Sequence, residues 1–172
     1  MTKTIFLAAG CFWGAQHYLK QIRGVLETET GFANGNTDNP SYEQVYTDTT
    51  GYAEAVRVVF DPEVLPLRKL VELYFDCIEP TSVNRQGEDC GTRYRTGIYF
   101  IEPEDYAVIK EVYDEVQRNY INDLAVEVQP IERFFAADES HQDYLDKHPD
   151  GYCHLPQSLF EFARKANEKK EG

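Results

Sequence analysis

The sequence lacks any apolar run that approaches the roughly 18 residues of a membrane-spanning helix. Residues 1–9 also lack a basic segment followed by a long apolar segment and a small-residue cleavage site, so we expect no signal peptide and a cytoplasmic location. Positive charge is scarce, because 17 Lys and Arg stand against 30 Asp and Glu, which gives a net charge of −13. An acidic surface of this kind argues against nucleic acids and anionic membranes as partners.

Internal repeats and low-complexity segments are also missing from the sequence. A chain of 172 residues is long enough for one substantial core and short for two. We therefore expect a single domain over residues 1–172, in which residues 150–172 form a C-terminal tail. The sequence carries no signal for oligomerisation, and we expect a monomer.

The four cysteines are widely spread and include no C-x-x-C pair. This pattern argues against a disulfide-stapled secreted domain and gives little support for a zinc site. The three late histidines could each serve as a base, yet none has a spacing that identifies a cysteine protease. Redox or catalytic use of a cysteine is the better interpretation. The four cysteines are Cys11, Cys77, Cys90 and Cys153, and the three late histidines are His141, His148 and His154.

Expected strands and helices alternate irregularly along the chain. This order predicts an α+β protein, a two-layer sandwich around a mixed, mostly antiparallel sheet in a ferredoxin-like variant, with long irregular loops. Strands are expected at 4–9, 25–31, 53–60, 96–101 and 126–131, and helices at 14–23, 66–77, 103–119, 139–148 and 159–167. Two long loops, residues 32–51 and 78–95, are rich in tyrosine and glycine and are expected to gather around Cys11.

Cys11 follows an apolar strand and precedes a helix, between Gly10 and the rings of Phe12 and Trp13. At a helix N-terminus, unpaired backbone N–H groups favour a thiolate, so a nucleophilic form is expected near neutral pH. A buried structural cysteine is the alternative. The two large rings favour the nucleophile, because they form an apolar pocket as easily as they fill a core.

Glu54 falls on the same face of its strand as Val56, Val58 and Phe60. A carboxyl group at the end of an apolar face has its pKa raised by desolvation, so Glu54 could stay protonated near neutrality and act as an acid. The alternative is that Glu54 lies at the solvent-exposed end of the strand, and the pattern alone leaves both interpretations open.

Cys153 lies in the segment Gly151-Tyr152-Cys153, which could swing onto Cys11. A sulfenic acid on Cys11 would condense with this second thiol to give a disulfide that an external reductant could reopen. The alternative is an unused exposed thiol.

Several motifs, in order, closely resemble the peptide methionine sulfoxide reductase A family. They are Gly10-Cys11-Phe12-Trp13-Gly14, Tyr42, residues 51–56, Arg85-Gln86-Gly87 with Asp89, residues 91–95 and residues 141–145. The resemblance runs from about Phe6 to Cys153, which is most of the chain.

The resemblance implies an activity and a role for each matching residue. The family reduces the S epimer of methionine sulfoxide, free or in proteins, without a metal or an organic cofactor and with thioredoxin as reductant. By this resemblance Cys11 is the nucleophile and Cys153 the resolving thiol. The implied supporting roles are an acid in Glu54, hydroxyl donors in Tyr42 and Tyr94, a polar support in Asp89, and methyl-pocket walls in Phe12 and Trp13.

The chain departs from many relatives because no cysteine follows Cys153, so we expect a one-step relay from Cys11 to Cys153. Cys90 is interpreted as a packed thiol, with an off-pathway disulfide as the alternative, and Cys77 as a core residue. Two other functions stay open at this point. They are a thiol peroxidase, which would share the sulfenic acid, and a zinc-binding or partner-binding module.

Overall fold

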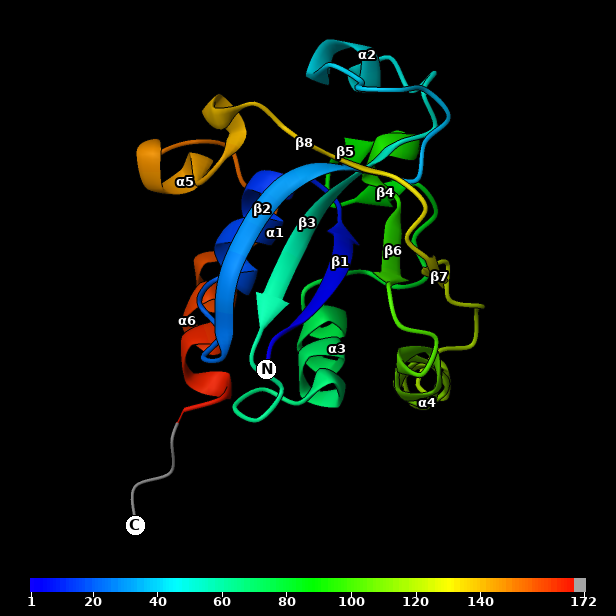
Figure 1. The fold of residues 1–172 in the computed structure, drawn as a ribbon, viewed down its shortest axis with the longest axis vertical. Coiled ribbons are helices and arrows are strands. Elements are labelled where there is room, and N and C mark those ends of the chain that lie inside the picture. Colours follow the sequence, from blue (N-terminus) through cyan, green and yellow to red (C-terminus); the bar gives the residue numbers. More distant parts are fainter. Residues whose placement is uncertain (169–172) are drawn as a thin grey trace.

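We describe the protein from a computed structural model, which describes residues 1–168. Residues 169–172, the end of the expected tail, lie outside the described residues. A six-stranded sheet has the strand order β7-β6-β1-β3-β2-β8, and a small hairpin is formed by β4 and β5 (Figure 1). The strands are β1 Lys3–Ala9, β2 Val25–Ala33, β3 Ala53–Phe60, β4 Arg85–Gln86, β5 Asp89–Cys90, β6 Thr96–Phe100, β7 Glu127–Pro130 and β8 Phe134–Ala136.

The helices connect these strands and cover the sheet. They are α1 Phe12–Leu19, α2 Tyr42–Tyr46, α3 Leu67–Asp76, α4 Asp105–Gln117, α5 Tyr144–Lys147 and α6 Gln157–Ala166. Only the β6–β7 pair is parallel among the strand pairs of residues 1–168. The expected α+β class with a mixed, mostly antiparallel sheet is confirmed, and the ferredoxin-like assignment stays a prediction. No helix in the described part of the chain is long and apolar enough to cross a membrane.

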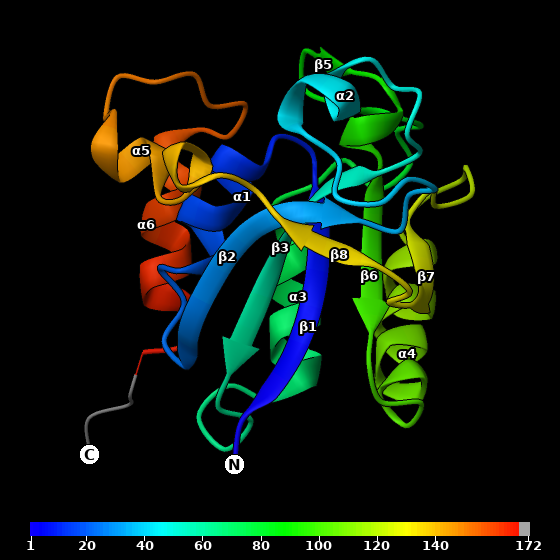
Figure 2. The ribbon, with the colours of Figure 1, turned by 45° about the horizontal axis from the view of Figure 1, so that its top comes forward.

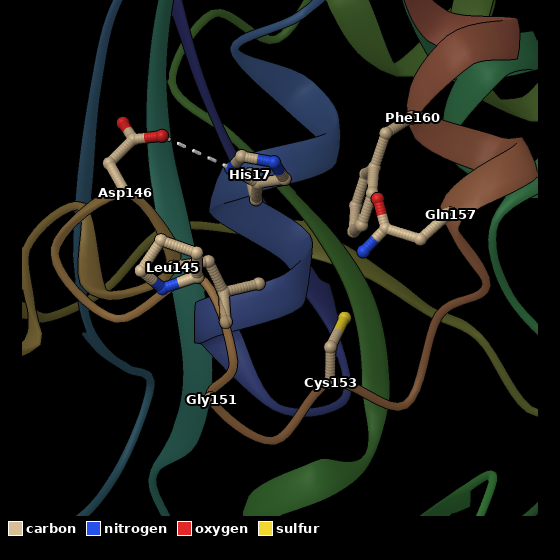
Figure 3. A pocket seen from close by; sticks show the side chains of 8 residues that line it. His17, Leu145, Asp146, Gly151, Cys153, Gln157 and Phe160 are labelled. Atoms are coloured by element: carbon tan, nitrogen blue, oxygen red, sulfur yellow. Dashed lines mark ion pairs between the residues drawn. The ribbon is translucent and has the colours of Figure 1, made fainter.

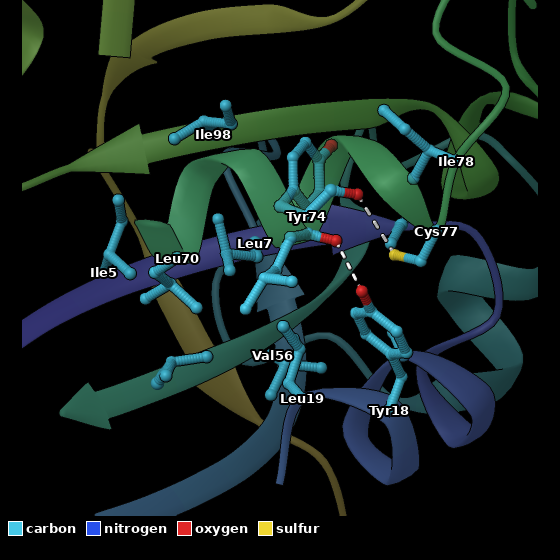
Figure 4. Packing of buried hydrophobic residues seen from close by; sticks show 14 of the residues in the cluster. Ile5, Leu7, Tyr18, Leu19, Val56, Leu70, Tyr74, Cys77, Ile78 and Ile98 are labelled. Atoms are coloured by element: carbon cyan, nitrogen blue, oxygen red, sulfur yellow. Dashed lines mark hydrogen bonds between the residues drawn. The ribbon is translucent and has the colours of Figure 1, made fainter. Parts of the chain in front are cut away.

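The two faces of the sheet have different cores. Alternating residues of β1 and β3, such as Leu7, Val56 and Val58, join the main core with α1 and α3 (Figure 4). The opposite face carries a smaller cluster that includes Ala8 and Tyr99. The predicted alternation of β3 is therefore confirmed, because one side of the strand is fully buried.

The two expected loops contain short structured elements that composition did not indicate. Ser41 caps α2 through a capping box with Gln44, within the expected loop 32–51. The hairpin β4–β5 lies within the expected loop 78–95. The expected helix 139–148 is wrong as a continuous helix, because Asp143 has a left-handed φ of 51° that separates a short 3-10 turn from α5.

These short elements gather at one end of the sheet. Helices α2 and α5 and the β4–β5 hairpin lie near the point where β1 ends and α1 begins (Figure 2). The sheet therefore presents Cys11, between β1 and α1, to the loops that were expected to surround it.

Tyr74 of α3 fixes the helix layer to the sheet at this end. Its buried hydroxyl donates to the Ala8 carbonyl oxygen at 2.6 Å and accepts from the Gly97 backbone N–H at 3.0 Å. The hydroxyl thus satisfies one backbone group on each of two neighbouring strands, β1 and β6.

We expect Tyr74→Phe to lower the free energy of unfolding by about 2 kcal/mol, because both backbone groups would lose a buried partner. Urea denaturation of the variant and the wild type measures the difference. Tyr120→Phe is the matched control, since Tyr120 is 43% exposed, and it should leave the stability unchanged. Equal stability of the Tyr74 variant and the wild type would contradict this role.

Candidate active site

Cys11 is the residue that precedes the first turn of α1, and it is buried. Gly10 before it has a left-handed φ of 82°, and a Cβ atom there would lie 2.7 Å from the side chain of Gln86. Only glycine fits both the conformation and the space, so this junction between strand and helix is specified by the sequence.

Burial changes the expected protonation of Cys11. Desolvation raises the pKa of its thiol well above the ordinary value, and the nearby carboxylates of Glu54 and Asp89 raise it further. The backbone N–H groups of Trp13 and Gly14 lower the pKa, as the helix N-terminus predicts, but the desolvation effect is larger. The expectation of a resting thiolate is therefore wrong. Cys11 rests as a thiol, and its proton must be removed before or during attack.

Glu54 is 1% exposed, so the solvent-exposed alternative is wrong. Its Oε1 accepts a hydrogen bond from the Phe12 backbone N–H at 3.1 Å, while its Oε2 is buried without a hydrogen-bond partner within residues 1–168. Desolvation raises the pKa of Glu54 to about 8, although the Phe12 N–H and the positive charge of Arg93 lower it. The carboxyl group is therefore mostly protonated at neutral pH.

Phe12 and Trp13 lie in a group of stacked rings. Tyr144 stacks on Trp13 with ring centroids 3.8 Å apart, and His141 stacks on Tyr42 with centroids 4.4 Å apart. The Trp13 indole N–H also donates to Nδ1 of His141 at 3.2 Å. The sequence did not identify His141 and Tyr144 as part of this wall, although both fall within the motif 141–145.

Tyr42 and Tyr94 come from the two long loops, and both lie within the electrostatic influence of Glu54. Burial and the Glu54 carboxylate raise the pKa of both phenols, that of Tyr94 to about 12, so both keep their protons. Arg93 is a further charged residue here, with its guanidinium 4.4 Å from the Tyr94 ring centroid and 2.6 Å from Asp48. Arg93 precedes Tyr94 in the motif of residues 91–95, but nothing in its spacing indicated that it lies at the site.

Cys153 lies against the first turn of α1. A Cβ atom added at Gly14 would be 2.8 Å from its Sγ. The thiol also lines a cavity of about 260 Å³ between α1 and α6, together with His17, Leu145 and Phe160 (Figure 3). The structure therefore places Cys153 beside the helix turn that Cys11 begins, with one side open to this cavity.

The other cysteines have different environments. Cys77 is buried at the end of α3, as expected. Cys90 is exposed at the end of β5, so its interpretation as a packed thiol is wrong. A two-residue strand in a narrow hairpin leaves no layer to cover its side chain. All four cysteines of the described chain are free thiols.

The fold and the site define a class of protein, a thiol-based oxidoreductase. A buried cysteine precedes the Phe12 N–H that holds a protonated carboxyl group, two phenols feel the charge of this carboxyl group, and a second thiol lies against the same helix turn. This set can deliver a proton and a nucleophile to one polar group of an otherwise apolar substrate.

Comparison with known proteins gives the family. The family model "Peptide methionine sulfoxide reductase" matches residues 3–171. "Peptide methionine sulfoxide reductase MsrA" of Lachnoclostridium phytofermentans is 50% identical over 166 residues, covering 96% of this chain and all of the relative. The Clostridium acetobutylicum protein of the same name is 50% identical over 157 residues, covering 91% and 97%. The chain therefore belongs to the peptide methionine sulfoxide reductase family, a family of oxidoreductases.

Solved structures agree with this assignment. Reduced Mxr1 from Saccharomyces cerevisiae superposes with a TM-score of 0.84 at 37% identity, covering 88% of each chain. Mxr1 in complex with Trx2 superposes with a TM-score of 0.60 at 26% identity, covering 83% of this chain and 84% of that one.

Glu54→Gln is expected to remove a pH dependence of stability. The pKa of Glu54 rises from 4.5 in the unfolded chain to about 8 in the fold. The folded state keeps a proton that the unfolded state loses, so stability falls as the pH rises from about 4.5 to about 8. Relative to the wild type, the variant should gain about 3 kcal/mol between pH 5 and pH 8.

Denaturant unfolding at both pH values measures this gain. The matched control is Glu104→Gln, because Glu104 is exposed. A constant difference between wild type and Glu54→Gln across this pH range would show that Glu54 ionises normally.

Proposed function

We propose that the protein reduces the S epimer of methionine sulfoxide, free or in proteins, to methionine, with Cys11 as the nucleophile. The observation that carries the proposal is the buried, protonated carboxyl group of Glu54. The Phe12 N–H holds this group at the start of α1, directly after Cys11. A sulfoxide has an electrophilic sulfur and a basic oxygen, so attack on the sulfur requires a proton at the oxygen.

The first step transfers the oxygen from substrate to enzyme. The Cys11 sulfur attacks the sulfoxide sulfur while Glu54 protonates the oxygen, and the thiol proton of Cys11 returns to the carboxylate. The S–O bond of the substrate breaks as the oxygen passes to the Cys11 sulfur, which gives methionine and a Cys11 sulfenic acid. Tyr42 and Tyr94 donate hydrogen bonds to the developing negative charge on oxygen, which their raised pKa values allow.

Substrate recognition relies on aromatic contact, because a methyl group offers no hydrogen bond. Phe12 and Trp13 form the wall for this group, and the stacks with Tyr144 and His141 hold the Trp13 ring in one orientation. Neither metal nor organic cofactor takes part in the proposed step.

The second step forms a disulfide between Cys11 and Cys153 and releases water. Thioredoxin then reduces the disulfide, a role supported by the Mxr1 relative that forms a complex with Trx2. In this proposal residues 1–172 act as one monomeric catalytic domain in the cytoplasm. Residues 150–172 are its C-terminal tail, and the tail supplies the resolving cysteine.

An assay with each epimer of methionine sulfoxide and dithiothreitol tests the function. We expect the wild type to reduce the S epimer only, and Cys11→Ser to lose at least about 1,000-fold in rate, because a hydroxyl is a far weaker nucleophile. Cys153→Ser should still release one methionine per enzyme in the first turnover without a reductant. Turnover of hydrogen peroxide with untouched sulfoxides would identify a thiol peroxidase instead.

Gly14→Ala is expected to slow disulfide formation, by up to about 100-fold, while the first methionine forms normally. The new Cβ atom would lie 2.8 Å from the Cys153 sulfur and displace it. Rapid quenching followed by thiol alkylation and mass spectrometry measures both products.

The control for Gly14→Ala is the same substitution in the Cys153→Ala background. Without the sulfur, the helix propensity of alanine should dominate, and the substitution should destabilise the protein less than it does in the wild type. An equal cost in both backgrounds would contradict the contact.

A further inference from the structure

His154 carries a buried ring nitrogen that takes part in neither step of the proposed reaction. The side chain is 3% exposed, and its Nε2 lies 3.0 Å from the Ala9 carbonyl oxygen. A carbonyl oxygen only accepts hydrogen bonds, so Nε2 must be the protonated nitrogen. Nδ1 is then the free nitrogen of the neutral ring, and it has no hydrogen-bond partner among residues 1–168.

The Asp89 carboxylate lies close to this nitrogen. Asp89 Oδ2 is 4.0 Å from Nδ1, and it too is buried without a hydrogen-bond partner in the described chain. In the neutral ring, two acceptor atoms face each other across this gap. The lone pairs of these two atoms repel each other. A proton on Nδ1 would replace this repulsion by an ion pair with Asp89, so Nδ1 is placed to accept one proton.

The Cys153 thiol and this nitrogen both lie against Gly14 of α1. The Sγ of Cys153 and the Nδ1 of His154 are 2.8 and 3.3 Å from the same point, the position that a Cβ atom of Gly14 would occupy. Burial raises the pKa of Cys153 above its ordinary value, so the group is a thiol at neutral pH. The Leu155 backbone N–H, 3.3 Å from Sγ, can stabilise the thiolate but cannot accept its proton.

We propose that His154 accepts the thiol proton of Cys153 during disulfide formation and that Asp89 stabilises the resulting imidazolium. This inference rests on the proposed function, because it requires a sulfenic acid on Cys11 and Cys153 as its resolving thiol. It also gives Asp89 a different role from a polar support of the sulfoxide.

The step balances in atoms and electrons. The S–H bond of Cys153 breaks, its proton passes to Nδ1, and the sulfur attacks the Cys11 sulfur. The S–S bond forms as the S–O bond of the sulfenic acid breaks, and the leaving hydroxyl takes up the proton from His154 to become water. The sulfenic sulfur is reduced, the Cys153 sulfur is oxidised, and no further reactant is needed.

His154→Gln is the variant that tests the proposal. A glutamine Nε2 can keep the donor to the Ala9 carbonyl, but the side chain has no base. In a single turnover with the S epimer and no reductant, we expect the variant to form methionine at the wild-type rate. Disulfide formation should fall by about 100-fold at pH 7, and the Cys11 sulfenic acid should accumulate. Mass spectrometry after quenching and alkylation measures all three species.

The pH profile of disulfide formation separates a base from a structural residue. The charged groups that face His154 are Asp89 from β5, Glu79 and Asp76 near the end of α3, and the Cys153 thiol. Burial lowers the pKa of His154, so the wild-type rate should rise with pH through that pKa and then stay level. The variant rate should continue to rise toward the raised pKa of Cys153 and approach the wild type at high pH.

Two further variants complete the experiment. Asp89→Asn should slow disulfide formation less than His154→Gln, because it removes the partner of the imidazolium and leaves the base. Glu104→Gln, at an exposed residue outside the site, should leave every rate unchanged. Normal methionine formation in His154→Gln shows that the variant is folded.

Different results would contradict the role of His154, the role of Cys153 or the proposed function. Disulfide formation at the wild-type rate in His154→Gln, or a rate deficit of equal size at all pH values, would overturn the role of His154. A wild-type disulfide that joins Cys11 to Cys90 would overturn the role of Cys153. A wild type that forms no methionine would overturn the proposed function itself.

Discussion

The hydrogen bond from the Phe12 backbone N–H to the Glu54 carboxyl group joins the start of α1 to β3 inside the main core. It fixes the position of a carboxyl group whose second oxygen has no partner in the described residues. Because the group is desolvated on all sides, the neutral form is favoured, and a proton is held within the core. In the proposed reaction this proton passes to the sulfoxide oxygen. Tyr42 and Tyr94, which the two long loops supply, donate hydrogen bonds to the same oxygen.

Burial imposes the same difficulty on both thiols of the proposed reaction. It raises the pKa values of Cys11 and Cys153, so each rests protonated and each needs a nearby group to accept its proton. Glu54 can serve Cys11 once it has given its own proton to the substrate oxygen. His154 can serve Cys153, because the Ala9 carbonyl fixes the tautomer that leaves Nδ1 free.

Much of the fold and of the site could be predicted from sequence, since strand alternation and glycine at tight junctions are local signals. The alternation of β3 placed Glu54 on the same face as Val56 and Val58 but left its burial open, and Gly10 marked the junction at Cys11. Protonation of Cys11 could not be predicted, because it depends on how much of the chain covers the thiol. The exposure of Cys90 and the stacking of Tyr144 on Trp13 also depend on tertiary contacts, which no local pattern encodes.

The aromatic wall depends on two amide side chains that act as backbone partners. Gln142 accepts from the Thr30 N–H at 2.8 Å and donates to the Thr30 carbonyl at 2.9 Å, which extends the pairing of β2 beyond β8. Gln16 of α1 accepts from the Asp143 N–H at 2.8 Å. These bonds hold the chain on both sides of the left-handed Asp143, so the irregular segment that carries His141 and Tyr144 is fixed against the sheet and the helix. A rigid wall loses little entropy when a substrate group enters, and the proposed recognition of a methyl group, which has only van der Waals contacts to offer, depends on that saving.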